Sequence, residues 1–393
     1  MYEIDEKELV AIRKVFEKKK LFRYQSAGPG ECDLFEREFA RKIGTKHSLL
    51  VTSGTNALIA ALAAAGVGPG DEVIIPAYTF VATATAVTAV GAIPVIANID
   101  ETLGISPAEA RRLITDRTRA IIPVHMDGLS ADLKAITKLA RKHELVVIED
   151  VAQAIGGSFQ GMRLGSWGDF GCFSLNENKN ISCGEGGIIS VSKRAFYERV
   201  WCMQDASAQF SPVRKTVFRD TEPFMGLSMR VSEITGAVMR VQLKRLDPIL
   251  RGLRARKKIF IERLKGQSRA RVVLGNCAPG DCASSLHLLF EDPESAAAFG
   301  RKIRAKGVLF APATARPAHA CWKWTNLLGE NATYPGGRNP YSMTDRKYSY
   351  HTAQYLDSIG ILMRTLKMDI DLNQDPDVTA VWAERVAREL SRG

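Results

Sequence analysis

The chain has 393 residues, of which 46% are hydrophobic and 25% are charged, and its formal net charge is +11. This length and composition suit a globular enzyme with one large and one smaller domain. They exclude a membrane-spanning protein, because no apolar run reaches the roughly 20 residues that cross a bilayer.

The positive charge admits two interpretations. It suits a nucleic-acid-binding protein, or a surface that attracts phosphorylated or nucleotide-linked small molecules. Basic residues are dispersed, apart from a cluster at residues 250–258, and the sequence holds no helix-turn-helix signal or zinc finger. We therefore expect neither nucleic acid nor a membrane as a partner.

Seven cysteines are scattered along the chain, and the closest pair stands in "CAPGDC", residues 277–282. One pair without a second pair or a histidine cluster is weak evidence for zinc, so we expect reduced thiols and no metal site. The first 20 residues are charged and helix-prone, without the apolar core of a secretory signal. These features favour the cytoplasm.

Between about residues 45 and 195, short β-rich runs alternate with helical patterns such as 55–65 and 131–144. Several of the runs are apolar almost throughout, as in strands covered by helices on both faces. The alternation predicts an α/β domain with a mainly parallel sheet. The expected strands are 48–53, 72–77, 93–99, 120–125, 145–150, 171–175 and 187–192.

Residues 229–266 read as a long, basic, amphipathic helical region, which Pro248 is expected to kink or interrupt. After about residue 267 the pattern becomes α+β and ends in a helix near 377–391. We therefore predict an N-terminal segment with the large domain over residues 1–255. A small C-terminal domain follows over residues 256–393.

The first candidate site is "VTSGTNALIAAL", in which a strand leads through Ser53, Gly54 and Thr55 directly into a helix. Backbone amides at a helix N-terminus are unpaired and attract anions such as phosphate. The alternative is ordinary N-capping by Ser53 or Thr55. Taken alone, the stretch favours the capping interpretation.

The second is Asp150, at the carboxyl end of the apolar run "LVVIED". Open α/β sheets bind ligands at this edge, and a poorly solvated carboxylate there requires a cationic partner. The alternative, an aspartate that caps the next helix, is equally compatible with the sequence.

The third is Lys179 in "LNENKNISCGEGGIIS", between an expected strand and a glycine-rich turn. Such a lysine is usually a solvated surface cation. If it is enclosed, its pKa falls and it becomes a nucleophile that forms Schiff bases. Phe80, or less favourably Tyr78, offers an aromatic face, although core packing is the better explanation of Phe80 when it is taken alone.

Together these candidates match the needs of one cofactor. Pyridoxal phosphate (PLP) requires a phosphate cradle, a carboxylate for its protonated ring nitrogen, an aromatic or apolar face and a lysine for its aldehyde. The chain supplies a candidate for each requirement, in a consistent order along the sequence.

Many consecutive motifs resemble the DegT/DnrJ/StrS family of sugar aminotransferases. They include "SGTNALIAALAAAGVGPGDEVIIPAYTFVATA", "PVHMDG", "VIEDVAQAIGGSFQGMRLGSWGDFGCFSL", "KNISCGEGG" and "SEITGAVMRVQLKRLD". The similarity is strong over residues 25–265. It implies an α/β, fold type I PLP-dependent transferase, with a mainly parallel sheet between helices and a smaller C-terminal α+β domain.

The resemblance assigns roles to individual residues. Lys179 matches the lysine that forms the Schiff base and then shuttles a proton, with pyridoxamine phosphate (PMP) as the intermediate form of the cofactor. Asp150 matches the partner of the ring nitrogen, Gln153 a residue near the ring's 3-hydroxyl group, and Phe80 the stacking position. The family's phosphate contacts match Gly54, Thr55 and Ser174.

Family members are usually homodimers in which the partner chain completes each active site. Many carry "GxNxR" where this chain has "GLSMR", so Ser228 replaces an asparagine that reaches the neighbouring subunit's phosphate. A hydroxyl group can still donate a hydrogen bond there. Related dehydratases carry histidine in place of the lysine, so the presence of Lys179 favours transamination.

"LFRY", "FMGLSMRVSE" and "GILMRTLKMDI" resemble the subgroup of the transaminase that makes 8-amino-3,8-dideoxy-octulosonate, whose substrate carries a carboxylate. Arg23, its neighbour Tyr24 and Arg364 are therefore candidate substrate contacts. For the two arginines, a surface or structural ion pair is at least as compatible with the sequence.

The resemblance predicts a PLP-dependent aminotransferase, which moves an amino group from glutamate or glutamine to a keto sugar or related keto-sugar acid. Such reactions belong to amino-sugar, surface-polysaccharide or natural-product biosynthesis. Two alternatives remain open: a PLP-dependent sugar dehydratase or lyase on the same scaffold, and a non-catalytic regulatory homologue.

Overall fold

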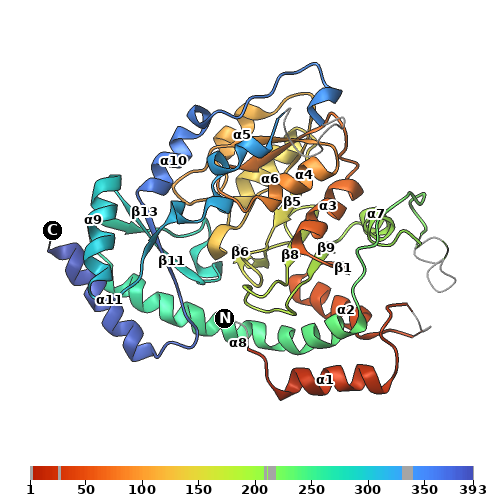
Figure 1. The fold of residues 1–393 in the computed structure, drawn as a ribbon, viewed down its shortest axis with the longest axis horizontal. Helices are drawn as coiled ribbons and strands as arrows, with labels where there is room; N and C mark the ends of the chain where they lie inside the picture. The colour runs from red at the N-terminus through yellow and green to blue at the C-terminus, as the bar shows by residue number, and fades with distance from the viewer. Residues whose placement is uncertain (1–2, 25–27, 208–209, 211–217, 330–339, 393) are drawn as a thin grey trace.

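The structure, a computed structural model, describes residues 3–24, 28–207, 210, 218–329 and 340–392 (Figure 1). Its larger part surrounds a seven-stranded sheet of order β1-β9-β8-β5-β4-β2-β3. Strand β9 is antiparallel to both neighbours and the other pairs are parallel, which confirms the predicted mainly parallel sheet. The strands are β1 (His47–Val51), β2 (Glu72–Pro76), β3 (Ile93–Ala97), β4 (Thr118–Ile121), β5 (Val146–Asp150), β8 (Phe170–Ser174) and β9 (Gly187–Val191).

Helices cover both faces of this sheet. Val73 and Ile75 of β2 pack into a core with α3, α4 and α7, whereas Ile74 between them faces the core under α5 and α6. Alternate residues of a strand point to opposite faces, so a strand buried on both sides must be apolar throughout. The helices of the larger part are α2 (Glu31–Ile43), α3 (Gly54–Ala64), α4 (Ala82–Ala89), α5 (Pro107–Leu113), α6 (Leu133–Lys142) and α7 (Arg194–Gln204).

The C-terminal part holds a four-stranded antiparallel sheet of order β10-β11-β13-β12. Helices α9 (Pro293–Arg304) and α10 (Leu356–Met363) contact this sheet, and α11 (Pro376–Ser391) packs against α9. The predicted smaller C-terminal α+β region is thereby confirmed. Its strands are β10 (Ala270–Val272), β11 (Ser285–Phe290), β12 (Ala311–Pro312) and β13 (Thr365–Asp369), and a separate two-stranded ribbon joins β6 (Ser158–Phe159) to β7 (Met162–Arg163).

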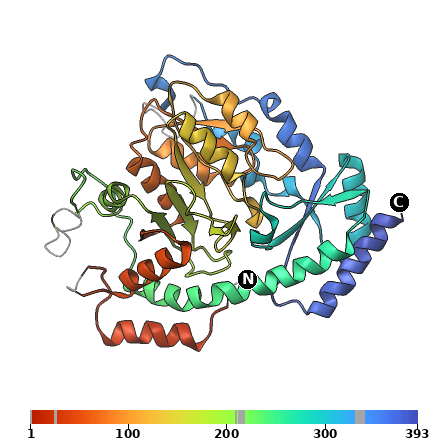
Figure 2. The same ribbon diagram turned by 180° about the vertical axis from the view of Figure 1, so that it is seen from behind.

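One long helix, α8 (Glu233–Arg263), runs along both parts of the molecule (Figure 2). Near one end it packs against α1 (Glu6–Glu17) and α2, and it also contacts α11. No helix in the described part of the chain is long and apolar enough to cross a membrane. The predicted domain division at residue 255 falls inside α8 and stays a prediction.

The expected interruption at Pro248 is wrong, because α8 continues through it. A proline inside a helix costs about 3 kcal/mol, since it removes one backbone hydrogen bond and crowds the preceding turn. Leu246, Ile249, Leu250 and Leu253 are buried around it. Burying each such side chain contributes about 1.5–3 kcal/mol, so packing on both sides of Pro248 outweighs that cost.

Helices α2 and α8 are in close contact at Gly236. A Cβ atom built at this position would lie 2.3 Å from the backbone nitrogen of Cys32, closer than atoms can pack. Gly360 in α10 has no atom within 4 Å of the corresponding point, so it provides a matched control.

We predict that Gly236→Ala lowers the free energy of unfolding by about 1–3 kcal/mol, because the helices must separate to admit the methyl group. Gly360→Ala should be neutral or stabilising by up to about 1 kcal/mol, because alanine favours the helix. Urea unfolding followed by circular dichroism measures both changes. Equal effects of the two substitutions would show that the contact at Gly236 is not tight.

Candidate active site

A cavity of about 730 Å³ opens at the carboxyl ends of the central strands, where open α/β sheets bind ligands. Asp150 ends β5 and Ser174 ends β8, and both reach its lining. The C-terminal part supplies the opposite wall. Seven of the residues predicted from the sequence line this cavity: Gly54, Thr55, Phe80, Asp150, Gln153, Ser174 and Lys179.

The N-terminus of α3 forms one end of the cavity. The Ser53 hydroxyl group accepts a hydrogen bond of 3.1 Å from the backbone nitrogen of Asn56, so this side chain caps the helix. The first amides of a helix have no partner within it, and here they belong to Gly54 and Thr55 at the cavity. A Cβ atom at Gly54 would lie 2.9 Å from that of Ser174, so glycine permits this close approach. Capping and anion binding are therefore compatible.

Asp150 is buried beside this end. Its Oδ2 accepts a hydrogen bond from the Thr83 hydroxyl group at 3.0 Å, and its Oδ1 accepts one from the backbone nitrogen of Ala152 at 3.1 Å. Burial raises the pKa of Asp150, although these hydrogen bonds and the charge of Lys179 oppose the shift. A buried carboxylate of this kind is stabilised by a nearby cation.

Lys179 lies in the loop that connects β8 to β9, and its side chain lines the cavity. Burial lowers the pKa of its amine. The charge of Asp150 opposes this shift and the charge of Arg316 adds to it. A lower pKa gives a larger fraction of neutral, nucleophilic amine. The structure therefore favours an enclosed lysine over a solvated surface cation.

Phe80 and Gln153 border the same space. Phe80 is 46% exposed, and its ring centroid lies 5.2 Å from the ring of His319. Tyr78, the other aromatic candidate, is fully buried and donates its hydroxyl hydrogen to Asp127, so Phe80 is the better stacking residue. The Gln153 side-chain oxygen accepts a hydrogen bond of 3.0 Å from the backbone nitrogen of Asp127.

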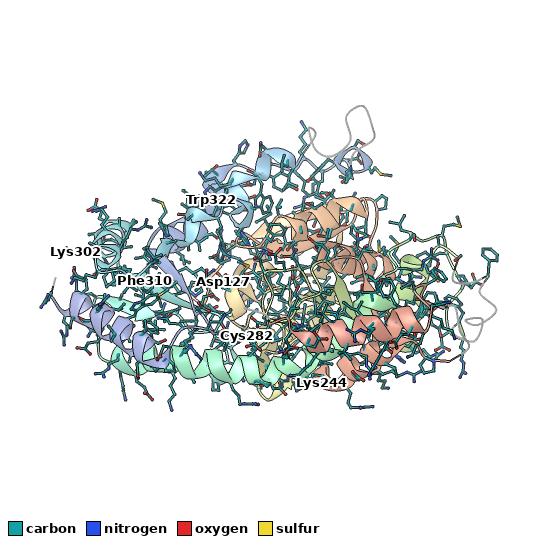
Figure 3. The ribbon with its side chains drawn as sticks, turned by 60° about the horizontal axis from the view of Figure 1, so that its bottom comes forward. Asp127, Lys244, Cys282, Lys302, Phe310 and Trp322 are labelled. Atoms are coloured by element: carbon teal, nitrogen blue, oxygen red, sulfur yellow. The ribbon has the colours of Figure 1, made fainter. Side chains whose placement is uncertain are left out.

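The sequence did not single out the cluster around Asp127, which lies near the middle of the molecule (Figure 3). Asp127 contacts Arg316 at 2.7 Å, His287 at 3.2 Å and Lys367 at 3.3 Å. Burial would raise the pKa of Asp127, but the hydrogen bond from His287 and the two cations outweigh burial and hold the pKa well below its usual value. Asp150 is the last residue of β5, whereas Asp127 lies in the short turn Met126–Gly128 that comes after β4. An acidic residue soon after an apolar run was the signal available to find it.

Four predicted residues do not line the cavity. Arg23 is fully buried in an ion pair with Glu36, and Arg364 pairs with Glu101 and donates to the Phe290 carbonyl oxygen at 3.0 Å. These contacts favour the ion-pair alternative for both arginines. The Tyr24 hydroxyl group donates to Gln204 at 3.2 Å, and Ser228 is exposed on the chain's own surface beside Arg230.

The cavity residues fit PLP. The amides of α3 suit its phosphate, and the buried Asp150 suits a protonated ring nitrogen. Lys179 offers an amine to its aldehyde, and the exposed face of Phe80 suits its ring. Among the described residues, no group of three or more histidine, cysteine or acidic side chains is placed to hold a metal ion.

The low pKa of Asp127 predicts a pH-dependent contribution to stability. The ionised carboxylate stabilises the fold above its unfolded pKa of about 3.8, and this contribution is lost as the pH falls through the lower folded pKa. Asp127→Asn should therefore lower the free energy of unfolding by about 3 kcal/mol at pH 7, because Arg316 loses its carboxylate partner and Lys367 keeps only the exposed Asp369. The difference from wild type should shrink below pH 3.8.

Urea unfolding at pH 7 and pH 3 measures this difference. The exposed residue Asp116 provides the control, because Asp116→Asn should change stability little at either pH. A difference between Asp127→Asn and wild type that does not vary with pH would contradict the ionised, cation-paired state of Asp127.

The model of the DegT/DnrJ/EryC1/StrS aminotransferase family matches residues 2–335 of the chain. GDP-perosamine synthase of Caulobacter vibrioides is 40% identical over 214 residues, 54% of this chain and 56% of that protein. UDP-N-acetyl-3-dehydro-alpha-D-glucosamine 3-aminotransferase of Acidithiobacillus ferrooxidans is 39% identical over 233 residues, 59% of this chain and 61% of that protein. The matches thus span about three-fifths of these relatives or slightly less.

Among solved structures, 3-amino-5-hydroxybenzoic acid synthase is similar over 100% of this chain and 98% of its own, with 25% identity and a TM-score of 0.81. The similarity therefore extends through the C-terminal part as well as the larger one. The chain belongs to the DegT/DnrJ/EryC1/StrS family of PLP-dependent aminotransferases.

Proposed function

We propose that this chain transfers an amino group from glutamate or glutamine to a keto sugar or related keto-sugar acid, with PLP as its cofactor. The observation that carries the proposal is the position of Lys179, which has a lowered pKa in the same cavity as Asp150 and the N-terminus of α3. The relatives from Caulobacter and Acidithiobacillus carry nucleotide-linked sugars in their names, which supports a sugar as the amino acceptor.

Each of the cavity residues would have a separate role in this reaction. When bound, PLP supplies an aldehyde for amines and a ring that accepts electrons from the bonds at the reacting carbon. The amides of Gly54 and Thr55 would hold its phosphate group, and Phe80 would cover its ring. Asp150 would keep the proton on the ring nitrogen, because the buried carboxylate is stabilised by that cation.

Lys179 would act as the general base and acid. Its neutral amine can remove a proton from the donor's α-carbon and return it to a neighbouring atom, because a lowered pKa makes both protonation states accessible. Transfer of nitrogen, as opposed to loss of water, is favoured by the lysine at this position.

We also propose that the enzyme is a homodimer whose partner chain completes each site. Exposed apolar side chains stand close to Ser228: Leu227 directly precedes it, Met225 lies three residues before it, and the Phe22 ring lies 5.4 Å from the Arg230 guanidinium carbon. A second copy covering this face would bury these side chains. The family resemblance of the motif around Ser228 implies that this residue would then reach the other copy's phosphate site. The location that the sequence favours for the dimer is the cytoplasm.

For catalysis, we predict that Lys179→Ala abolishes the visible absorption of the bound cofactor and lowers amine transfer by roughly 10⁴-fold or more. Lys134 on α6 is exposed, and Lys134→Ala should change neither property. Glutamate labelled with nitrogen-15 provides a test that needs no acceptor, because the label should appear in PMP released by denaturation.

Three results of this experiment would count against the proposal. Colourless protein that ignores added PLP would contradict the cofactor. Unlabelled cofactor, together with loss of water from a keto sugar, would favour the dehydratase alternative. Bound PLP without either reaction would favour the regulatory alternative.

For the assembly, light scattering should give twice the mass of one chain, and Leu227→Asp should shift the protein toward the monomer by placing a charge in the interface. Leu309 is also exposed but lies in the C-terminal part, so Leu309→Asp is the matched control and should leave the mass unchanged. A wild-type monomer at micromolar concentration would contradict the shared site.

A further inference from the structure

The wall that the C-terminal part contributes to the cavity carries two cations. Arg316 lies between the short turns η4 (Ala313–Ala315) and η5 (Pro317–His319), and Lys367 lies on β13. Both line the cavity, with 33% of the Arg316 side chain and 13% of the Lys367 side chain exposed. Cations partly withdrawn from water attract an anion more strongly than cations on an open surface.

The two carboxylates that pair with these cations differ in burial. A single buried carboxylate, Asp127, contacts both Arg316 and Lys367. Burial lowers the pKa of His287, the third partner of Asp127, more than Asp127 raises it, which favours the neutral form of this ring. Asp369 pairs with Lys367 at 2.7 Å but is 70% exposed, and water screens its charge. Arg316 and Lys367 therefore share one carboxylate that is withdrawn from water, and the second carboxylate offsets Lys367 only through a screened, exposed contact.

The guanidinium group of Arg316 also has donors to spare. Among the described residues, every hydrogen bond of Arg316 is donated by its Nη2 atom. The distances are 2.7 and 2.8 Å to the two oxygens of Asp127, and 2.9 Å to the Tyr78 hydroxyl oxygen. The Nε and Nη1 atoms have no hydrogen-bond partner among the described residues, so they can donate to a ligand. A guanidinium group presents five N–H donors in a planar arrangement that matches a carboxylate.

The spare donors lie within electrostatic reach of the reacting amine. The charge of Arg316 contributes to the lowered pKa of both Lys179 and His319. The acidic residues on the loop of Lys179 that border the cavity, Glu177 and Glu185, are exposed, so water screens them. An anionic group held by Arg316 would therefore place the rest of its molecule near Lys179.

We propose that Arg316, assisted by Lys367, binds the carboxylate of a substrate while the substrate's amine or ketone faces Lys179. The proposal rests on the aminotransferase function proposed above and deepens it. An amino-acid donor always carries a carboxylate, and a keto-sugar acid carries one as well. The two half-reactions use one cavity in turn, so the same guanidinium group can serve donor, acceptor or both.

Calorimetric titration of the PLP-loaded enzyme tests the site with unreactive probes. Glutarate stands for the donor, methyl α-D-glucuronoside for a sugar acid, and methyl α-D-glucoside for an uncharged sugar. In Arg316→Gln the dissociation constant of a carboxylate probe should rise on the order of tenfold to a hundredfold, the range for one charge-assisted hydrogen bond. Lys367→Gln should raise it less, and binding of the uncharged sugar should not change in either variant.

Arg271→Gln is the matched control, because Arg271 is a 54% exposed arginine of the same antiparallel sheet that pairs with Glu101 outside the cavity. It should bind every probe as wild type does. Thermal melting verifies the fold of each variant. If Arg316→Gln does not fold, Arg316→Lys keeps the charge but loses the planar donors, and with Lys367→Gln it carries the same test.

If the Arg316 variant binds only glutarate more weakly, the site belongs to the donor. If it binds only the glucuronoside more weakly, the site belongs to the acceptor, and if it binds both more weakly, the site serves each in turn. The proposal is overturned if the folded variants bind both carboxylates as wild type does, or if wild type binds neither saturably. Nitrogen transfer measured on the same samples separates the two proposals. Carboxylate binding without transfer rejects only the aminotransferase, and transfer with unchanged binding rejects only this site.

Discussion

The burial of one helix fixes the relation between the two walls of the cavity. Helix α8 places apolar side chains against α1 and α2 of the larger part and reaches α11 of the C-terminal part without a break. Because the same rigid element supports both parts, the strand ends that carry Asp150 and Ser174 face a fixed partner surface. The gain from packing along α8 exceeds the cost of a proline in its interior, so the helix persists through Pro248.

Across the cavity, ion pairs form a second set of contacts between the larger part and the C-terminal part. Asp127 follows a central strand, whereas Arg316 and Lys367 come from the C-terminal sheet and its turns. A buried carboxylate is tolerated only when cations or hydrogen-bond donors compensate for lost hydration. The cluster thus combines structural and chemical roles. It closes one side of the cavity and, in our proposal, presents spare guanidinium donors to a substrate.

The sequence predicted the part of the site with local signals. Gly54, Asp150 and Lys179 belong to one α/β region, in which strand ends and helix starts mark the ligand edge of a parallel sheet. Arg316 and Lys367 have no such signal, because they reach the cavity only through the packing of the C-terminal part. Arg23 shows a different limit of sequence reasoning. A motif can single out an arginine, but only the fold shows that Arg23 is paired with Glu36 and lies away from the cavity.

Ser53 caps α3 with its side chain, so the phosphate site that we propose at this end of the cavity would be formed by backbone amides. Every residue except proline has a backbone N–H group, so anion binding by these amides would not depend on which side chains stand at the helix start. The position that admits least change is the one without a side chain, Gly54, where Ser174 leaves no room for a methyl group. Side chains around the site can therefore be replaced while the backbone amides at the start of α3 stay in place, provided that the helix begins at the same residue.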